Sequence, residues 1–317
     1  MSKSAPILFI VFVFCWGRIF SQQVDLHISD KNAVFLEGKD SVLVYQKEPK
    51  SLNGSYERAN YIHPLFSLDG VSITEDFPED HLHHRGIFWA WHQLYINRKR
   101  IGDGWEVKDF EWNVINTSET AVRNGAITLK NEVLWESEVY LDQDGAKIPF
   151  VSETNWITVY PRKGNYRVVD IKIQLYPLFD SISIGGSEDE KGYGGFSARV
   201  RLSEDVMFKD SEGKITPENT PVPGKNWINI LSRVGKDKTP YGLTIIPSKD
   251  NLPHPNPWIL RSQNSMQNAV YPFPGANPVP LSRESPLVLK YRLVVHDGFI
   301  QTTTLFDLQK EYYKLSE

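Results

Sequence analysis

Residues 169–175 read V-D-I-K-I-Q-L, and apolar and polar side chains alternate along the whole stretch. A β-strand turns successive side chains to opposite faces, so this period of two predicts a strand with one buried and one solvated face. Residues 289–295, L-K-Y-R-L-V-V, keep nearly the same period. Other stretches of similar character cover residues 24–29, 41–48, 127–135, 152–160, 227–234 and 241–246. The chain is therefore expected to be mostly β.

The C-terminal end has a different period. Apolar residues recur there at three- and four-residue spacing, which predicts one amphipathic helix carrying Leu305, Leu308, Tyr312 and Leu315. The proline-rich stretches 216–224, 247–258 and 271–286 carry large aromatic residues, so we expect ordered loops and no domain linker. We predict an all-β fold in which residues 22–317 form a single domain, an antiparallel β-sandwich of the galactose-mutarotase supersandwich type with one C-terminal helix. A jelly roll is the alternative.

The N-terminus has the layout of a secretory signal peptide over residues 1–21, with Lys3, an apolar run at 7–16 and a polar exit at 21–23. We therefore expect cleavage and a periplasmic location. The only cysteine, Cys15, lies inside this segment, so the mature protein must be stabilised by its core and not by disulfides. After it, the chain has no apolar run long enough for a membrane helix, so no membrane integration is expected.

The mature chain is mildly acidic. Loss of Lys3 and Arg18 with the signal leaves 33 basic and 39 acidic residues, a net charge of about −6. There is no basic stripe of the kind that binds nucleic acid. An anionic substrate stays compatible with this charge, because a few arginines can reverse the field inside a cleft. Nine Trp, fourteen Tyr and sixteen Phe residues offer faces for sugar rings, although most should serve the core and the sheets.

The densest group of reactive side chains lies at residues 74–91, T-E-D-F-P-E-D-H-L-H-H-R-G-I-F-W-A-W. It contains His81, His83 and His84, here called the histidine cluster, and Arg85 directly after them. Histidine exchanges protons near neutral pH, and arginine is suited to hold a carboxylate. The chemistry of the protein is therefore expected here. The alternative for each histidine is a hydrogen bond to loop backbone.

The histidine cluster also suggests a divalent metal site, completed by Asp80, Asp76 or the distant His254 and His296. On a strand, two of the three histidines would face one side, so a strand would supply two ligands at most. A chelator separates the metal hypothesis from metal-free acid–base chemistry. The cofactor requirement and the number of subunits stay open.

Several other residues have two possible interpretations, one structural and one functional. Trp89 and Trp91 share one face of an extended strand, where they either pack in the core or stack on a sugar. The run G-Y-G-G at residues 192–195 lacks the Lys-Ser and helix of a phosphate loop, so a tight turn or a close approach to substrate is expected. His254 lies on a rigid loop that could face the substrate-binding cleft. The neighbouring Asp297 could set the tautomer of His296.

Five blocks of sequence span nearly all of the mature chain: Y-I-H-P-L (61–65), T-E-D-F-P-E-D-H-L-H-H-R-G (74–86), G-Y-G-G-F-S-A-R (192–199), N-A-V-Y-P-F-P-G (268–275) and Y-R-L-V-V-H-D-G (291–298). With these blocks the chain resembles the PmoA-like family (DUF6807) of exported bacterial proteins. Within that family it is similar to ulvan oligosaccharide dehydratases. The resemblance implies removal of water from the non-reducing-end glucuronate or iduronate of a sulfated oligosaccharide, giving a 4,5-unsaturated uronate.

Such a reaction removes the weakly acidic C5 proton and protonates a poor leaving group, so it needs a base, an acid and positive charge near the carboxylate. Our hypothesis is that one residue of the histidine cluster acts as base or acid and that Tyr193 is the second proton carrier. Arg85 and Arg199 would neutralise the carboxylate of the anionic oligosaccharide. Further substrate contacts are expected from Trp91, His254 and Asp76.

Two other functions remain compatible with the sequence. A sugar epimerase or mutarotase-like enzyme would use similar groups without loss of water. A non-catalytic carbohydrate-binding protein would need the aromatic residues but not the clustered histidines.

Overall fold

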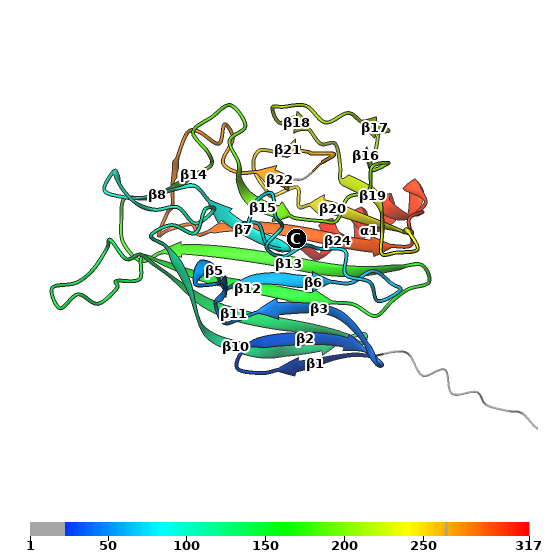
Figure 1. Ribbon diagram of the computed structural model, residues 1–317, viewed down its shortest axis with the longest axis horizontal. Coiled ribbons are helices and arrows are strands. Elements are labelled where there is room, and N and C mark those ends of the chain that lie inside the picture. The colour runs from blue at the N-terminus through cyan, green and yellow to red at the C-terminus, as the bar shows by residue number, and fades with distance from the viewer. Residues whose placement is uncertain (1–22, 264–265, 317) are drawn as a thin grey trace, which may run out of the picture.

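Two large antiparallel β-sheets form the body of the protein, for which a computed structural model describes residues 23–263 and 266–316 (Figure 1). The first sheet has the strand order β1 (Val24–Ile28), β2 (Asn32–Glu37), β3 (Asp40–Gln46), β6 (Tyr61–Leu65), β7 (Ile87–Trp91), β15 (Gly194–Ala198), β22 (Gln267–Val270), β21 (Pro257–Ile259) and β18 (Val222–Pro223). The second has the order β10 (Glu111–Arg123), β11 (Ala126–Glu136), β12 (Val151–Val159), β13 (Tyr166–Pro177), β24 (Leu287–His296), β20 (Thr239–Pro247), β19 (Ile228–Val234), β16 (Met207–Lys209) and β17 (Lys214–Ile215).

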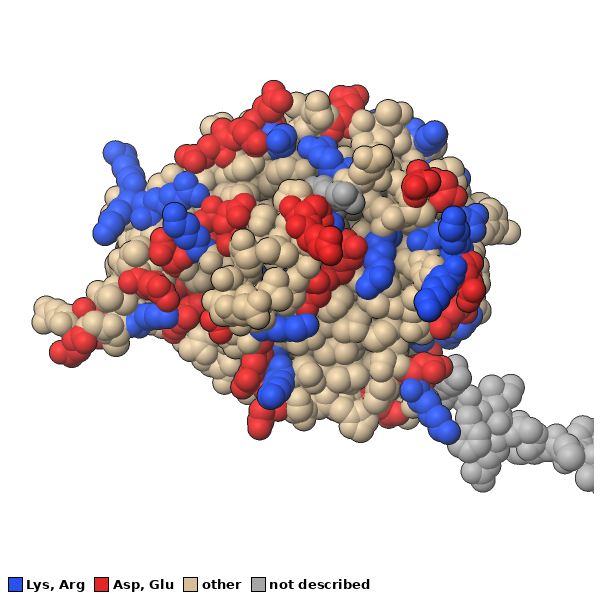
Figure 2. Space-filling view, in the orientation of Figure 1, with Lys and Arg blue, Asp and Glu red and all other residues tan. Residues whose placement is uncertain are grey.

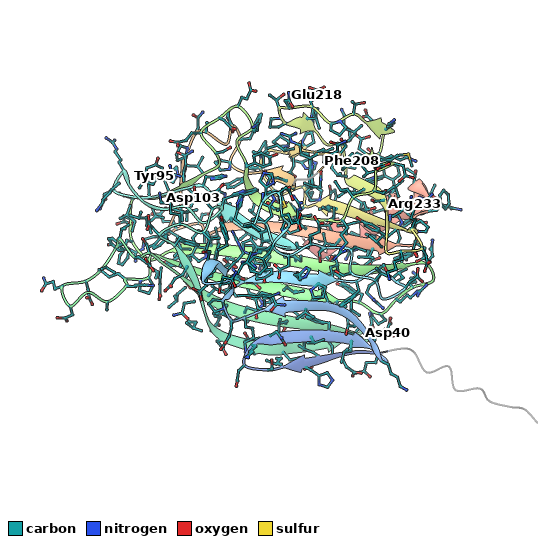
Figure 3. All side chains as sticks on the ribbon, in the orientation of Figure 1. Asp40, Tyr95, Asp103, Phe208, Glu218 and Arg233 are labelled. Carbon is teal, nitrogen blue, oxygen red and sulfur yellow. The ribbon has the colours of Figure 1, made fainter. Side chains whose placement is uncertain are left out.

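Smaller sheets lie at the margins of the two large ones. One has the order β23 (Val279–Pro280), β14 (Ile182–Gly185), β8 (Gln93–Ile96) and β9 (Lys99–Gly102), and a hairpin joins β4 (Lys50–Leu52) to β5 (Ser55–Arg58). Figure 3 places Tyr95 of β8 and Asp103, just after β9, toward one end of the molecule and Arg233 toward the other. The loop that follows β9 therefore begins near this end of the molecule. Residues of this loop form part of the candidate site.

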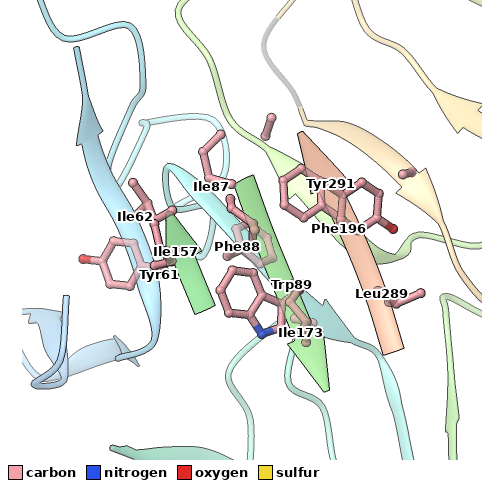
Figure 4. Packing of buried hydrophobic residues seen from close by; sticks show 14 of the residues in the cluster. Tyr61, Ile62, Ile87, Phe88, Trp89, Ile157, Ile173, Phe196, Leu289 and Tyr291 are labelled. Carbon is pink, nitrogen blue, oxygen red and sulfur yellow. The ribbon is translucent and has the colours of Figure 1, made fainter. Parts of the chain in front are cut away.

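The alternation along the strands builds the core between the two large sheets. The β13 side chains expected to face inward are all buried, at Val169, Ile171, Ile173 and Leu175. They belong to one hydrophobic cluster with Trp89 of β7 and Phe196 of β15, so both sheets contribute to it (Figure 4). The rings of Phe196 and Tyr291 stack across the interface with centroids 4.1 Å apart. Alternation thus places one face of each sheet in a shared interior.

A buried carboxylate joins the two sheets at the centre of this core. The oxygens of Glu153 on β12 accept hydrogen bonds from the indole Nε1 atoms of Trp89 (2.8 Å) and Trp135 (2.8 Å) and from the amides of Asn60 (2.9 Å) and Asn155 (2.8 Å). Burial raises the pKa of Glu153, although these hydrogen bonds act in the opposite direction. Four donors from both sheets satisfy a group that would otherwise be costly to bury.

The C-terminal helix α1 (Thr302–Ser316) covers part of the outer face of the second sheet. Its Leu305, Leu308 and Tyr312 pack with Ile246 of β20 and Val294 of β24. The helix and the three apolar positions were predicted. Leu315, expected on the same face, is instead 63% exposed, because the last turn reaches past the side chains that the helix packs against.

The all-β prediction is confirmed, as is the antiparallel sandwich with one C-terminal helix. Two sheets of nine strands each exceed the eight strands of a jelly roll. The predicted strand segments correspond to β1, β3, β11, β12, β13, β19, β20 and β24. Among the helices of the described residues, none has the length and apolar character required to cross a membrane. The predicted signal segment, residues 1–21, lies outside the described residues.

Candidate functional site

Residues 74–86 form a loop that is held against the first sheet by backbone pairing. Glu75 N donates to the carbonyl of Arg199 (3.1 Å), Arg199 N donates to the carbonyl of Gly86 (2.7 Å), and Gly86 N donates to the carbonyl of Glu75 (2.8 Å). A Cβ on Gly86 would lie 2.0 Å from the carbonyl oxygen of Ile62, so only glycine lets the loop approach β6 this closely. The histidines are thus fixed to the rim of a rigid sheet.

Within the loop, two successive turns gather the histidine cluster. His81 N donates to the carbonyl of Pro78 (3.0 Å), and His84 N donates to the carbonyl of His81 (2.9 Å). The rings of His81 and His84 stack at 4.6 Å, and His83 meets His84 edge to face at 4.5 Å. The limit of two ligands on one face, which holds for a strand, therefore does not apply to this segment. Turns curl the chain so that all three rings meet.

Three histidine rings in this region pair with a carboxylate through Nδ1. His81 Nδ1 lies 2.6 Å from Asp80, and this pair belongs to the same loop. The remaining two pairs reach across to the loop after β9, with 3.3 Å between His83 and Glu106 and 3.0 Å between His92 and Asp103. A carboxylate at Nδ1 fixes the tautomer and orientation of a histidine and leaves Nε2 to exchange protons. The His81 side chain is 42% exposed, against 12% for His83.

The environment keeps the inner histidines uncharged. Burial and the positive charge of Arg58 lower the pKa of His83 to about 3. Burial, followed by the neighbouring His83 and His81, lowers the pKa of His84 far below its usual value. His84 Nδ1 also accepts a hydrogen bond from Arg199 at 3.3 Å. At neutral pH both rings are therefore uncharged.

Arg199 organises the loop and has little capacity left for a substrate. Its guanidinium donates to Glu75 at 2.7 Å and to both oxygens of Asp80 at 2.6 and 3.0 Å. Burial alone would raise the pKa of Asp80, but the hydrogen bonds from Arg199 and His81 outweigh it and lower the pKa to about 2. The expected role of Arg199 in neutralising a substrate carboxylate is therefore replaced by a positioning role, because internal acids already occupy its donors.

Arg85 is likewise an internal group. Its side chain is fully buried, donates to Asp76 at 3.0 Å and to backbone carbonyls of Lys50 and Tyr56, and lies over the Phe77 ring at 3.2 Å. Asp76 is also held by Lys50 at 2.5 Å. The predicted substrate contacts at Arg85 and Asp76 are corrected on this geometry, since each side chain is committed to the other in the interior of the loop.

Trp105 connects the histidines to Tyr193. The indole lies 5.3 Å from the ring of His92, 6.1 Å from His84 and 5.4 Å from Tyr193. It rests on Phe88, on the face of β7 opposite to Trp89. The group therefore sits on the outer face of the first sheet, where Phe88 and Trp105 join it to the main hydrophobic cluster. Close backbone contacts of the neighbouring Gly192 with residue 275 and of Gly194 with residue 186 fix the turn that carries Tyr193, so these glycines serve chain packing.

A positive charge lies beside Tyr193. The guanidinium of Arg261 is 5.7 Å from the centre of the Tyr193 ring. It donates to the backbone carbonyls of Glu218 (2.6 Å), Leu260 (3.0 Å) and Asn219 (2.9 Å). None of these acceptors is a carboxylate, so they leave its charge uncompensated. Arg261 was not singled out from the sequence.

The other expected site residues lie elsewhere. Trp91 is fully buried, packs on Trp135 and donates from Nε1 to the carbonyl of Tyr271 at 2.8 Å, which corresponds to its core reading and not to substrate contact. His254 is exposed, and within the described residues no hydrogen bond, ion pair or ring contact joins it to the histidine cluster. His296 is fully buried beside Thr244 and Asn229, so these polar groups and not Asp297 adjoin its ring.

For a metal ion, the arrangement is unfavourable. In residues 23–263 and 266–316, no three or more His, Cys, Asp or Glu side chains are arranged to hold one. The cluster rings stack face to face or edge to face, and His81 and His83 direct Nδ1 to separate carboxylates. The completion of the site by Asp76, His254 or His296 is therefore corrected, since Asp76 is bound to Arg85 and the other two lie apart from the cluster.

The loop after β9, which supplies half of the site, was not predicted from the sequence. Asp103 Oδ1 accepts from the backbone N–H groups of Trp105 and Glu106 at 2.9 Å each, a turn that D-G-W-E at residues 103–106 could have indicated. Arg58 fixes the same loop by donating to the carbonyls of Gly104 (2.8 Å) and Trp105 (3.0 Å). Acidic and basic side chains are interspersed over the face of the molecule seen in Figure 2.

A model described as a family of unknown function, DUF6807, matches residues 33–308, which include both loops of the candidate site and nearly all of both sheets. No curated protein matches the chain. Any activity must therefore be argued from the site itself.

Proposed function

The chain belongs to the DUF6807 family, and we propose that it is a dehydratase that removes water from the non-reducing-end uronate of an ulvan-type sulfated oligosaccharide. The observation that carries the proposal is the pair of His81 and Asp80, in which an exposed imidazole is oriented through Nδ1 by an anchored carboxylate at 2.6 Å. This is the arrangement that proton abstraction requires. The likeness of five sequence blocks to the PmoA-like dehydratases supports the same reaction class.

In the proposed reaction, His81 Nε2 accepts the C5 proton of the uronate while Asp80 stabilises the resulting imidazolium. The electron pair of the C5–H bond forms the C4–C5 double bond, and the C4–O bond breaks. Tyr193 donates a proton to the departing hydroxyl, which leaves as water. One proton is taken up and one is released, so the substrate loses one water and gains a 4,5-unsaturated bond.

The substrate carboxylate needs a cation, because charge develops on it as the C5 proton leaves. We assign this role to Arg261, which lies 5.7 Å from the Tyr193 ring and donates only to backbone carbonyls among the described residues.

A C5 epimerase is the second candidate, because it begins with the same proton abstraction and the His81–Asp80 pair serves both. The two differ in the product, since an epimerase returns a proton to C5 and leaves the mass unchanged. A non-catalytic binding protein would change neither mass nor absorbance. We further propose that the protein is exported to the periplasm, where it would encounter uronate-terminated oligosaccharides.

The test is to incubate the purified protein with a saturated, uronate-terminated ulvan oligosaccharide and to follow ultraviolet absorbance and product mass. We expect an absorbing product lighter by one water, and a loss of at least about a hundredfold in rate for His81→Ala. His27→Ala is the matched control, because His27 is exposed on β1. Unchanged absorbance and mass would refute the dehydratase, and near-full activity of the alanine variants at all three clustered histidines would refute the site.

A further inference from the structure

A second candidate binding surface lies on the outer face of the second sheet, beside helix α1. Four residues stand directly opposite one another across β11, β12, β13 and β24, in the order Lys130, Trp156, Lys172 and Lys290. All four are partly exposed. Their neighbours Ile157 and Ile173 face the core, so this row is the solvent-facing side of the same strands. The proposed active site contains none of these residues.

The central pair of the row combines an aromatic face with a charge. Lys172 Nζ lies 4.4 Å from the centre of the Trp156 ring. Among the salt bridges of the described residues, none involves Lys172, so the indole is its main neighbour of opposite electrostatic character. The indole offers aromatic surface against which a sugar ring can pack, and the ammonium group beside it offers a positive charge for an acidic substituent.

Lys172 also stands directly opposite a like charge. Its cross-strand partner is Lys290, whose Nζ contacts Asp250 at 3.1 Å. Burial and the charge of Lys290 lower the pKa of Lys172. Like charges placed directly opposite each other destabilise a sheet, and an anion bound between them would relieve the repulsion. The strand pairing thus favours an anionic ligand at this point.

Three residues of the row, Trp156, Lys172 and Lys290, line a hollow large enough for sugar units. The hollow has a volume of about 540 Å³ and is bordered by β11, β12, β13 and β24 and by Tyr312 and Leu315 of α1. A neighbouring hollow of about 500 Å³ shares Lys172 and Lys290 with it. The one acid in the larger hollow, Asp170, is compensated by two hydrogen bonds from Arg292 at 2.7 and 2.8 Å. Among the described residues, the charge of Lys172 in this hollow therefore has no acidic partner.

We propose that this groove is a secondary binding site for acidic saccharide chains, with the Trp156 indole as sugar platform and Lys172 as the anion contact. The inference rests on the proposed function for the class of ligand, since the same sulfated polymer would supply both sites. It lies on the outer face of the second sheet, whereas the histidine cluster lies on that of the first. One polymer chain could therefore be retained here while the active site works on free ends.

The test measures binding without turnover. Electrophoretic retardation of the full-length mature protein in gels that contain intact ulvan gives the affinity, because internal uronates of the polymer are not at the reacting end. We expect Trp156→Ala and Lys172→Gln each to weaken retardation by about fivefold to tenfold, a loss of about 1 kcal/mol or slightly more. Lys99→Gln on β9 is the matched control for loss of one surface charge, and a gel with a neutral glucan is the control for the charge of the polymer.

His81→Ala separates this inference from the proposed function, because it should abolish turnover and leave retardation unchanged. A double variant Trp156→Ala, Lys172→Gln that is retarded as strongly as the wild type would overturn the proposed groove. Equal retardation by neutral glucan would overturn its preference for acidic chains. Normal turnover of short oligosaccharides by the double variant is expected, and circular dichroism would verify that its fold is intact.

Discussion

The histidine cluster should make the protein less stable in mild acid, and His83→Gln should remove a measurable share of that effect. Burial and Arg58 lower the pKa of His83 from its usual 6.5 to about 3. The unfolded chain therefore binds this proton below pH 6.5, whereas the folded protein does not until about pH 3. Stability is lost as the pH falls between these two values, because protonation favours the unfolded chain.

The magnitude follows from the difference between the two pKa values. At about pH 5, 1.5 units below the unfolded value, the lost stability is about 2 kcal/mol for this one side chain, since one unit corresponds to about 1.4 kcal/mol. The His83 side chain is only 12% exposed, so water screens the effect little. Glutamine keeps a polar side chain of similar length but does not titrate.

The assay is urea unfolding followed by tryptophan fluorescence at about pH 7 and about pH 5, for the wild type and for His83→Gln. We expect the loss of unfolding free energy between the two pH values to be about 2 kcal/mol smaller in the variant. His27→Gln, at an exposed position on β1, should behave as the wild type does. If His83→Gln lost as much stability as the wild type, the account of a buried, uncharged imidazole would be refuted.

Other predictions concern the site and the core. Asp80→Asn should lower the turnover rate by about a hundredfold with a smaller effect on substrate affinity, because His81 loses the carboxylate that orients it; steady-state kinetics separate the two. Chelation should leave turnover unchanged, since no described group of side chains is arranged to hold a metal, and loss of activity on dialysis against chelator would contradict this. Phe196→Ala should lower the free energy of unfolding by about 3–5 kcal/mol, measured in urea, because its ring stacks on Tyr291 at 4.1 Å. Gly242→Ala should destabilise by about 2 kcal/mol, since a Cβ there would lie 1.9 Å from the His296 ring; an unchanged midpoint of unfolding would show that the ring moves freely.

The sequence was sufficient for the architecture because a period of two is a local property. Ile171 and Ile173 are buried as their spacing predicts, and the change to helical spacing correctly located α1. The prediction that Leu315 packs with the other apolar residues of α1 was wrong. Helical spacing indicates which side of the helix a residue faces, but not how far the surface beneath the helix extends. Trp91 was expected to contact substrate, and its complete burial corresponds instead to the alternative of core packing.

The site was only partly predictable. The histidine cluster was found because its three members are close in sequence, but their mutual orientation depends on turns that no short periodicity reveals. Arg199 was expected to hold substrate because its residue type suits a carboxylate. Its guanidinium instead binds Glu75 and Asp80, which lie more than a hundred residues away in the sequence and are brought to it by the fold. Glu106 was missed for the same reason, since it reaches His83 only through the fold.

The proton-transfer role of the oriented imidazole is the central claim, and product mass is its most direct test. Purified protein and its His81→Ala variant would each be incubated with a saturated, uronate-terminated ulvan oligosaccharide and analysed by mass spectrometry. The account predicts a product lighter by one water from the wild type and unchanged substrate from the variant. Unchanged substrate from both, or the same product from both, would contradict it.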